Sequence, residues 1–63
     1  MASVEDISTV LSEFEYPLSA VFIGKKISPE PKTKKEVNST LYKMEKDSIV
    51  EKLEMSPILW RLR

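Results

Sequence analysis

The chain of 63 residues contains no cysteine and no histidine, and it has only one glycine. The absence of cysteine excludes a disulfide framework, and the absence of both residue types excludes the usual zinc sites. No apolar run approaches the roughly 20 residues that a membrane-spanning helix needs, and the N-terminal segment is acidic where a signal peptide would be basic. We therefore expect a soluble intracellular module, cytoplasmic or nuclear, with no metal or other cofactor.

An enzyme is the least favoured class of function. Without histidine, cysteine or a Gly-rich phosphate loop, the chain offers no nucleophile paired with a base. Glu51 and Glu54 are more simply interpreted as solvated strand residues than as a catalytic pair. We expect no catalytic residues in this domain, and this expectation does not extend to further domains of a longer protein.

The length allows one small domain, which we expect to span residues 1–63. A chain of this size buries only about 60% of the surface that its unfolded form exposes, so the core must be compact. The tight length and the ending at Arg63 suggest a domain cut from a longer protein.

Charge is balanced overall but unevenly distributed. The ten basic and ten acidic residues cancel, which at first disfavours nucleic-acid binding. However, residues 1–23 carry four acidic residues and no basic one, whereas residues 24–46 carry seven lysines and three glutamates. The middle of the chain can therefore present a local positive patch, although a solvated lysine-rich face is the commoner meaning of such a bias.

Two helices are predicted in the first 27 residues. Ser3 precedes apolar residues at helical spacing, which predicts a first helix over residues 4–14. A turn and a short extended piece follow, and Ser19 is expected to cap a short second helix over residues 20–27 that contains the only glycine. The proline-containing segment 28–31 cannot continue a helix and forms a stiff connector.

A third helix begins at a capping box, Thr33-x-x-Glu36, in which each side chain can satisfy a polar group of the first turn. At 100° per residue, one face of this helix is apolar and predicted to pack, and another is polar and displayed. The packed residues are Val37, Leu41 and Met44, and the displayed residues are Lys34, Lys35, Asn38 and Tyr42.

Two strands complete the chain. Residues 49–54 have the β-branched, partly alternating pattern of a strand, residues 55–57 form a turn, and residues 58–62 return as a second strand. The order of helix, extended piece, helix, helix and hairpin is that of an α+β winged helix. This fold consists of three helices and a small antiparallel sheet with a β-hairpin wing. In that architecture the third helix is the usual recognition helix.

The third helix and the hairpin also resemble a known family. The run Lys34-Lys35-Glu36-Val37-Asn38-x-x-Leu41-Tyr42, with Pro57 fifteen residues after the tyrosine and Trp60 three later, is similar to the Zα domain. This family binds left-handed Z-form DNA and RNA. It occurs in an RNA-editing adenosine deaminase, an innate sensor of Z-form nucleic acid, a fish kinase, and poxviral and fish-herpesviral antagonists of the interferon response. The resemblance covers about half of the chain.

The resemblance implies a nucleic-acid-binding surface and a role for its residues. Tyr42 would contact a guanine in the syn conformation, braced by Trp60, whose indole N–H would reach phosphate through water. Pro57 would rigidify the wing against the sugar-phosphate chain, and Ser56 would donate its hydroxyl. The complete expected set is Lys34, Lys35, Asn38, Ser39, Tyr42, Ser56, Pro57 and Trp60.

The residue types themselves fit this surface, although each has an ordinary explanation. Lys34 and Lys35 lie in the first helical turn, where the helix dipole disfavours cations by a few tenths of a kcal/mol, so a phosphate partner would explain them. The ordinary explanation of the two lysines is a solvated pair. The two aromatic residues could simply belong to the core, and Ser56-Pro57 could be an ordinary turn. This sequence departs from the family at two positions. Many members have a second proline where this chain has Ile58, and several have a basic residue where it has Ser39.

The expected mechanism is recognition of duplex shape. The zigzag backbone of a left-handed duplex spaces its phosphates unlike B-form, and a rigid surface can match only one of the two. We expect a protein that is monomeric without nucleic acid, prefers alternating CG duplexes, and binds in several copies to hold them in Z-form. The alternative from another class is a winged helix used for protein interaction or dimerisation, with Tyr42 and Trp60 facing a partner protein.

Overall fold

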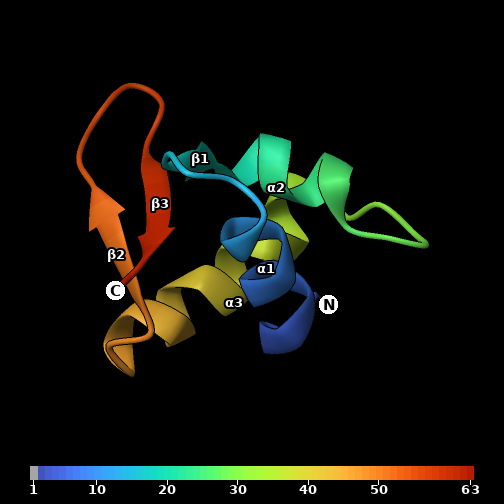
Figure 1. The fold of residues 1–63 in the computed structure, drawn as a ribbon, viewed down its shortest axis with the longest axis horizontal. Helices are drawn as coiled ribbons and strands as arrows, with labels where there is room; N and C mark the ends of the chain where they lie inside the picture. Colours follow the sequence, from blue (N-terminus) through green and yellow to red (C-terminus); the bar gives the residue numbers. More distant parts are fainter. Residues whose placement is uncertain (1) are drawn as a thin grey trace.

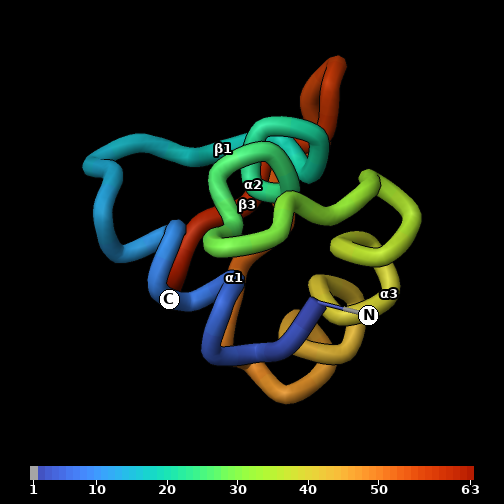
Figure 2. Tube along the Cα trace, turned by 90° about the vertical axis from the view of Figure 1, so that its right-hand side faces the viewer, coloured from blue at the N-terminus to red at the C-terminus, as the bar shows by residue number. Residues whose placement is uncertain are grey.

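Three helices pack against a small antiparallel sheet in the computed structural model, which describes residues 2–63 (Figure 1). The architecture is the predicted α+β winged helix. In chain order the elements are α1 (Val4–Ser12), β1 (Leu18–Ser19), α2 (Ala20–Lys26), α3 (Lys34–Lys46), β2 (Val50–Leu53) and β3 (Leu59–Leu62). The turn between β2 and β3 is the wing, and Figure 2 shows it standing clear of the helices.

Each helix begins at a hydroxyl side chain that caps it, as the sequence predicts. A cap oxygen that accepts from the third helical amide satisfies one of the backbone donors left free at a helix start. The three bonds join Asp6 N to Ser3 Oγ (3.0 Å), Phe22 N to Ser19 Oγ (3.2 Å) and Glu36 N to Thr33 Oγ1 (3.3 Å). The threonine half of the predicted capping box is thus present, and Thr33 Oγ1 also donates to Glu36 Oε1 at 3.2 Å, which joins the two side chains directly.

The sheet has the strand order β1-β3-β2, with β3 in the centre. Trp60 on β3 pairs with Leu18 on one side and with Lys52 on the other, so these three side chains form one row across the sheet. The two residues of β1 are the predicted extended piece. Their pairing with β3 ties the segment before α2 to the wing.

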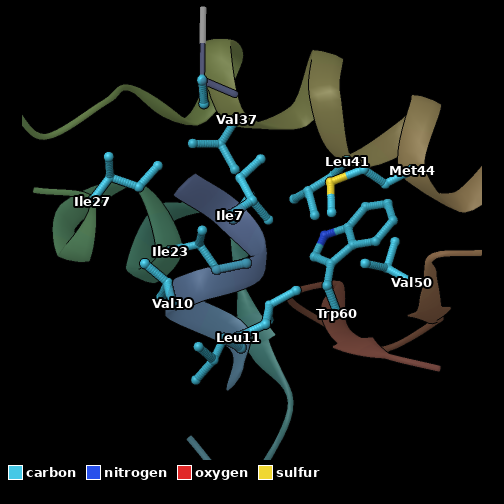
Figure 3. Close-up of a cluster of buried hydrophobic side chains, with 13 residues drawn as sticks. Ile7, Val10, Leu11, Ile23, Ile27, Val37, Leu41, Met44, Val50 and Trp60 are labelled. Atoms are coloured by element: carbon cyan, nitrogen blue, oxygen red, sulfur yellow. The ribbon is translucent and has the colours of Figure 1, made fainter. Parts of the chain in front are cut away.

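The core lies between the helices and the sheet. The predicted packed face of α3 is confirmed, because Val37, Leu41 and Met44 are all buried. Trp60 is 1% exposed, and its indole lies beside Leu41, Met44 and Val50 (Figure 3). The largest buried side chain of the domain therefore comes from the wing hairpin and joins it to α3.

Gly24 explains how the second helix and the connector fit together. The Lys32 amide donates to the Gly24 carbonyl at 2.9 Å, which brings the connector backbone against α2. A Cβ atom at position 24 would collide with the Lys32 carbonyl oxygen. The single glycine is therefore required by close backbone approach, which outweighs its poor helix propensity.

The N-terminal segment is fixed to α3 by a buried bond between distant residues. The Thr40 hydroxyl donates to the Ala2 carbonyl oxygen at 2.6 Å, and both residues are buried. The sequence pattern gives no signal for this bond.

Element ends differ from the predictions by one or two residues, as they commonly do. The helix α1 ends at Ser12 rather than Phe14, with Glu13 as its C-cap residue. The strands begin one residue later than predicted, and β2 ends one residue earlier. Within residues 2–63, no helix is long and apolar enough to cross a membrane, and no three acidic, histidine or cysteine side chains are grouped to hold a metal ion.

Candidate functional site

A groove of about 410 Å³ lies between the start of α2, the exposed face of α3 and the wing. It is the place where six of the eight expected site residues meet. These six are Lys34, Asn38, Tyr42, Ser56, Pro57 and Trp60. The remaining lining residues are Ser19, Ala20, Val21, Met55 and Ile58.

The polar wall of the groove belongs to α3. Lys34, Asn38 and Tyr42 are spaced four residues apart, so they lie above one another on one face of the helix. The buried residues Val37 and Leu41 occupy another face and fix the rotation of α3 about its axis. The packing of the core thus determines which side chains α3 presents to the groove.

The opposite wall is the wing, which is mostly apolar. Ser56 and Pro57 are exposed at the turn, and Ile58 is half-buried against the core. Met55 is exposed beside them. A groove with one polar and one apolar wall suits a ligand that is itself charged on one side and apolar on the other.

Tyr42 and Trp60 join the two walls. Their ring centroids are 5.1 Å apart and the rings are nearly perpendicular, at 86°, which is the edge-to-face arrangement that aromatic pairs prefer. Trp60 is buried, whereas Tyr42 is 44% exposed and lines the groove. The contact implied by the family resemblance is therefore present, with the tryptophan in the core and the tyrosine at the surface.

Lys52 on β2 lies against the same tyrosine. Its Nζ atom is 5.0 Å from the centroid of the Tyr42 ring and 3.3 Å from Glu54 Oε2. The hydrogen bond to Glu54 raises the pKa of Lys52 above its ordinary value of 10.5, against a smaller opposing effect of burial. Lys52 is therefore an ammonium ion under all ordinary conditions.

Lys35 and Ser39 do not line the groove, although both are exposed on the adjoining face of α3. Within residues 2–63, neither Lys34 nor Lys35 forms an ion pair. Both ammonium groups lie in the first turn of α3 and are accessible to an anion from solvent.

Sequence reasoning missed part of the groove. Ser19, Ala20 and Val21 enter it because the pairing of β1 with β3 brings the start of α2 beside the wing. Met55 enters from the wing turn, and Lys52 approaches Tyr42 from β2. The register of the hairpin could have indicated Lys52, since it places that residue opposite Trp60.

Compared with known proteins, the chain matches no protein-family model, no curated protein sequence and no solved structure.

Proposed function

We propose that this domain binds left-handed Z-form duplexes of DNA and RNA by shape, through α3 and the wing, and shifts right-handed duplexes to the Z-form. The proposal is supported above all by the contact of Tyr42 with Trp60, at 5.1 Å, in a groove that also contains Lys34, Asn38 and Pro57. These residue types at this spacing are the ones on which the resemblance to Zα domains depends.

Rigidity of the groove is a second support. Recognition by shape requires a surface that does not adapt to the wrong duplex. Tyr42 is held by a buried indole, and α3 is fixed by its own buried face. Such a surface binds phosphates through Lys34 and Lys35 and meets a base or sugar with Tyr42 and Pro57.

The conversion of a duplex follows from differential affinity. A ligand shifts a conformational equilibrium only by as much as it binds one state better than the other. Moving an equilibrium from 1:99 to 99:1 takes about 5.5 kcal/mol of such preference. Several domains along one alternating CG duplex supply this sum more readily than one, so we expect conversion to need several copies per duplex.

The biological setting is proposed from the resemblance alone. It is that of a module in a nucleic-acid-sensing or interferon-response protein, or in a viral antagonist of one, in the cytoplasm or the nucleus.

Titration of an alternating CG duplex, followed by circular dichroism, tests the proposal. We expect the wild-type domain to invert the long-wavelength bands of the duplex, and Tyr42→Ala to abolish the inversion while the domain stays folded. Tyr16→Ala is the matched control, since Tyr16 is also exposed but lies outside the groove. An unchanged duplex spectrum at excess wild-type protein would refute the proposal.

A protein-interaction module is the alternative. It predicts that Tyr42 and Trp60 meet a partner protein together, and the burial of Trp60 disfavours such a joint contact. Under this alternative the duplex spectrum stays right-handed at any protein concentration.

A further inference from the structure

Lys52 is held at two points beside the groove, although it is not among the site residues expected from the sequence. Its Nζ atom lies over the Tyr42 ring, 5.0 Å from the centroid, and 3.3 Å from Glu54 Oε2. Only 20% of the side chain is exposed, in contrast to 74% for Glu54. The lysine stem is therefore packed against the domain, and the carboxylate beside it is solvated.

The hairpin register explains this placement. Lys52 on β2 lies directly opposite Trp60 on β3, and side chains at directly opposite positions share one face of the sheet. Tyr42 reaches this face from α3. Its ring consequently meets two neighbours from the sheet, the indole of Trp60 at 86° to its plane and the ammonium of Lys52 over its face.

Direct phosphate binding by Lys52 is disfavoured by the same geometry. Lys52 does not line the groove, whereas the Tyr42 ring against which its ammonium lies does. The ammonium is also occupied by an aromatic ring and a carboxylate. A cation over a ring is attracted to its electron-rich face and resists rotation of that ring.

We propose that Lys52 is a positioning residue of the groove, which fixes the ring of Tyr42 against Trp60 and is itself held by Glu54. This assignment rests on the proposed function, because the ring is positioned for a duplex ligand. Lys52 acts through Tyr42 and not on phosphate.

The test measures binding to a duplex already locked in the Z-form by 8-bromoguanine, at several salt concentrations. Lys52→Met removes the cation–π contact that fixes the Tyr42 ring, so we expect it to weaken binding to this duplex about three- to tenfold. The slope of log K against log salt should not change, whereas loss of a phosphate contact would reduce it by about 0.9. Lys52→Arg keeps a cation over the ring and should restore most of the affinity.

Lys26→Met is the matched control. Lys26 also lies over an aromatic ring, 5.4 Å from the centroid of Phe22, but neither residue lines the groove. Lys26→Met removes the same positive charge as Lys52→Met, and we expect its affinity for the locked duplex to stay within about twofold of that of the wild type. A nuclear magnetic resonance readout is independent of binding, since the Lys52 methylene protons next to Nζ should be shifted upfield by the Tyr42 ring and should lose that shift in Tyr42→Leu.

The possible results separate this assignment from the proposed function. Wild-type affinity in Lys52→Met, or a salt slope reduced by about 0.9, overturns the positioning role while leaving Z-form binding intact. Failure of the wild type to bind the locked duplex overturns both. An unshifted Lys52 methylene signal shows that the contact with Tyr42 is absent in solution and also overturns the assignment.

Glu54, the residue after β2, provides a second test, with Glu51 on β2 as its control. Glu54→Gln and Glu51→Gln each remove one negative charge, but Glu51 pairs with Arg61 at 2.8 Å on the opposite face of the sheet. If Glu54 holds Lys52, Glu54→Gln should bind the locked duplex about twofold more weakly than Glu51→Gln. Equal affinities would contradict a role for Glu54.

Discussion

At the scale of single residues, Gly24 occupies a helical position in which no side chain fits. Alanine normally stabilises a helix interior by about 1 kcal/mol relative to glycine. Here the added methyl group would meet the Lys32 carbonyl oxygen, a backbone atom that cannot move aside as the end of a flexible side chain could. Local propensity and tertiary packing therefore have opposite signs at this position, and packing should prevail.

We expect Gly24→Ala to lower the free energy of unfolding by about 1–3 kcal/mol, because the connector must shift away from α2. Urea denaturation followed by far-ultraviolet circular dichroism measures the change. Ser39→Ala, at an exposed position of α3, serves as a control that should be neutral or stabilising by about 0.5 kcal/mol. A stabilised Gly24→Ala would mean that the connector does not contact α2 in solution.

At the scale of elements, the start of α3 connects stability to the candidate site. Thr33 caps the helix, and the next residue, Lys34, lines the groove. Fraying of the first turn would displace Lys34 and Lys35 together.

We expect Thr33→Ala to cost about 0.5–2 kcal/mol of stability and to weaken duplex binding as well. Thermal unfolding and a binding titration of the same samples check both effects. Thr9→Ala in the exposed middle of α1 controls for loss of a threonine and should change neither quantity appreciably. Weakened binding in Thr9→Ala would point to a general loss of folding instead.

The elements also show what the sequence could predict. Caps at Ser3, Ser19 and Thr33, together with apolar spacing in α1 and α3, predicted the helices because these signals are local. The pairing of Leu18 with Trp60 and the bond from Thr40 to Ala2 join residues far apart in the chain, and no local pattern specifies such contacts. The polar wall that α3 gives to the groove could therefore be predicted. The places of Val21 and Met55 in the groove, and of Lys52 beside Tyr42, depend on tertiary structure and could not.

At the scale of the whole molecule, charge acts locally. The chain has a formal net charge of zero at pH 7, so its long-range attraction to nucleic acid is weak. Under the proposed function, affinity for a duplex would therefore come from a few lysines in direct contact with phosphate, and each contact would contribute separately to the salt dependence.

We expect Lys34→Gln to reduce the magnitude of the salt slope for the locked Z-form duplex by about 0.9, the loss of one phosphate contact. Lys43→Gln makes the same change in net charge at an exposed position of α3 outside the groove, and its slope should equal that of the wild type. Fluorescence anisotropy of a labelled duplex at several salt concentrations measures both. Equal slopes for Lys34→Gln and the wild type would remove Lys34 from the set of phosphate contacts.

The only tryptophan of the chain belongs at once to the core and to the groove wall. Tyr42 lies 5.1 Å from it, close enough for light absorbed by the phenol to be emitted by the indole. The domain therefore carries its own optical probe of folding, because unfolding exposes Trp60 to water and shifts its emission to longer wavelength. The loss of energy transfer from Tyr42 as the two rings separate reports the same event, without any label.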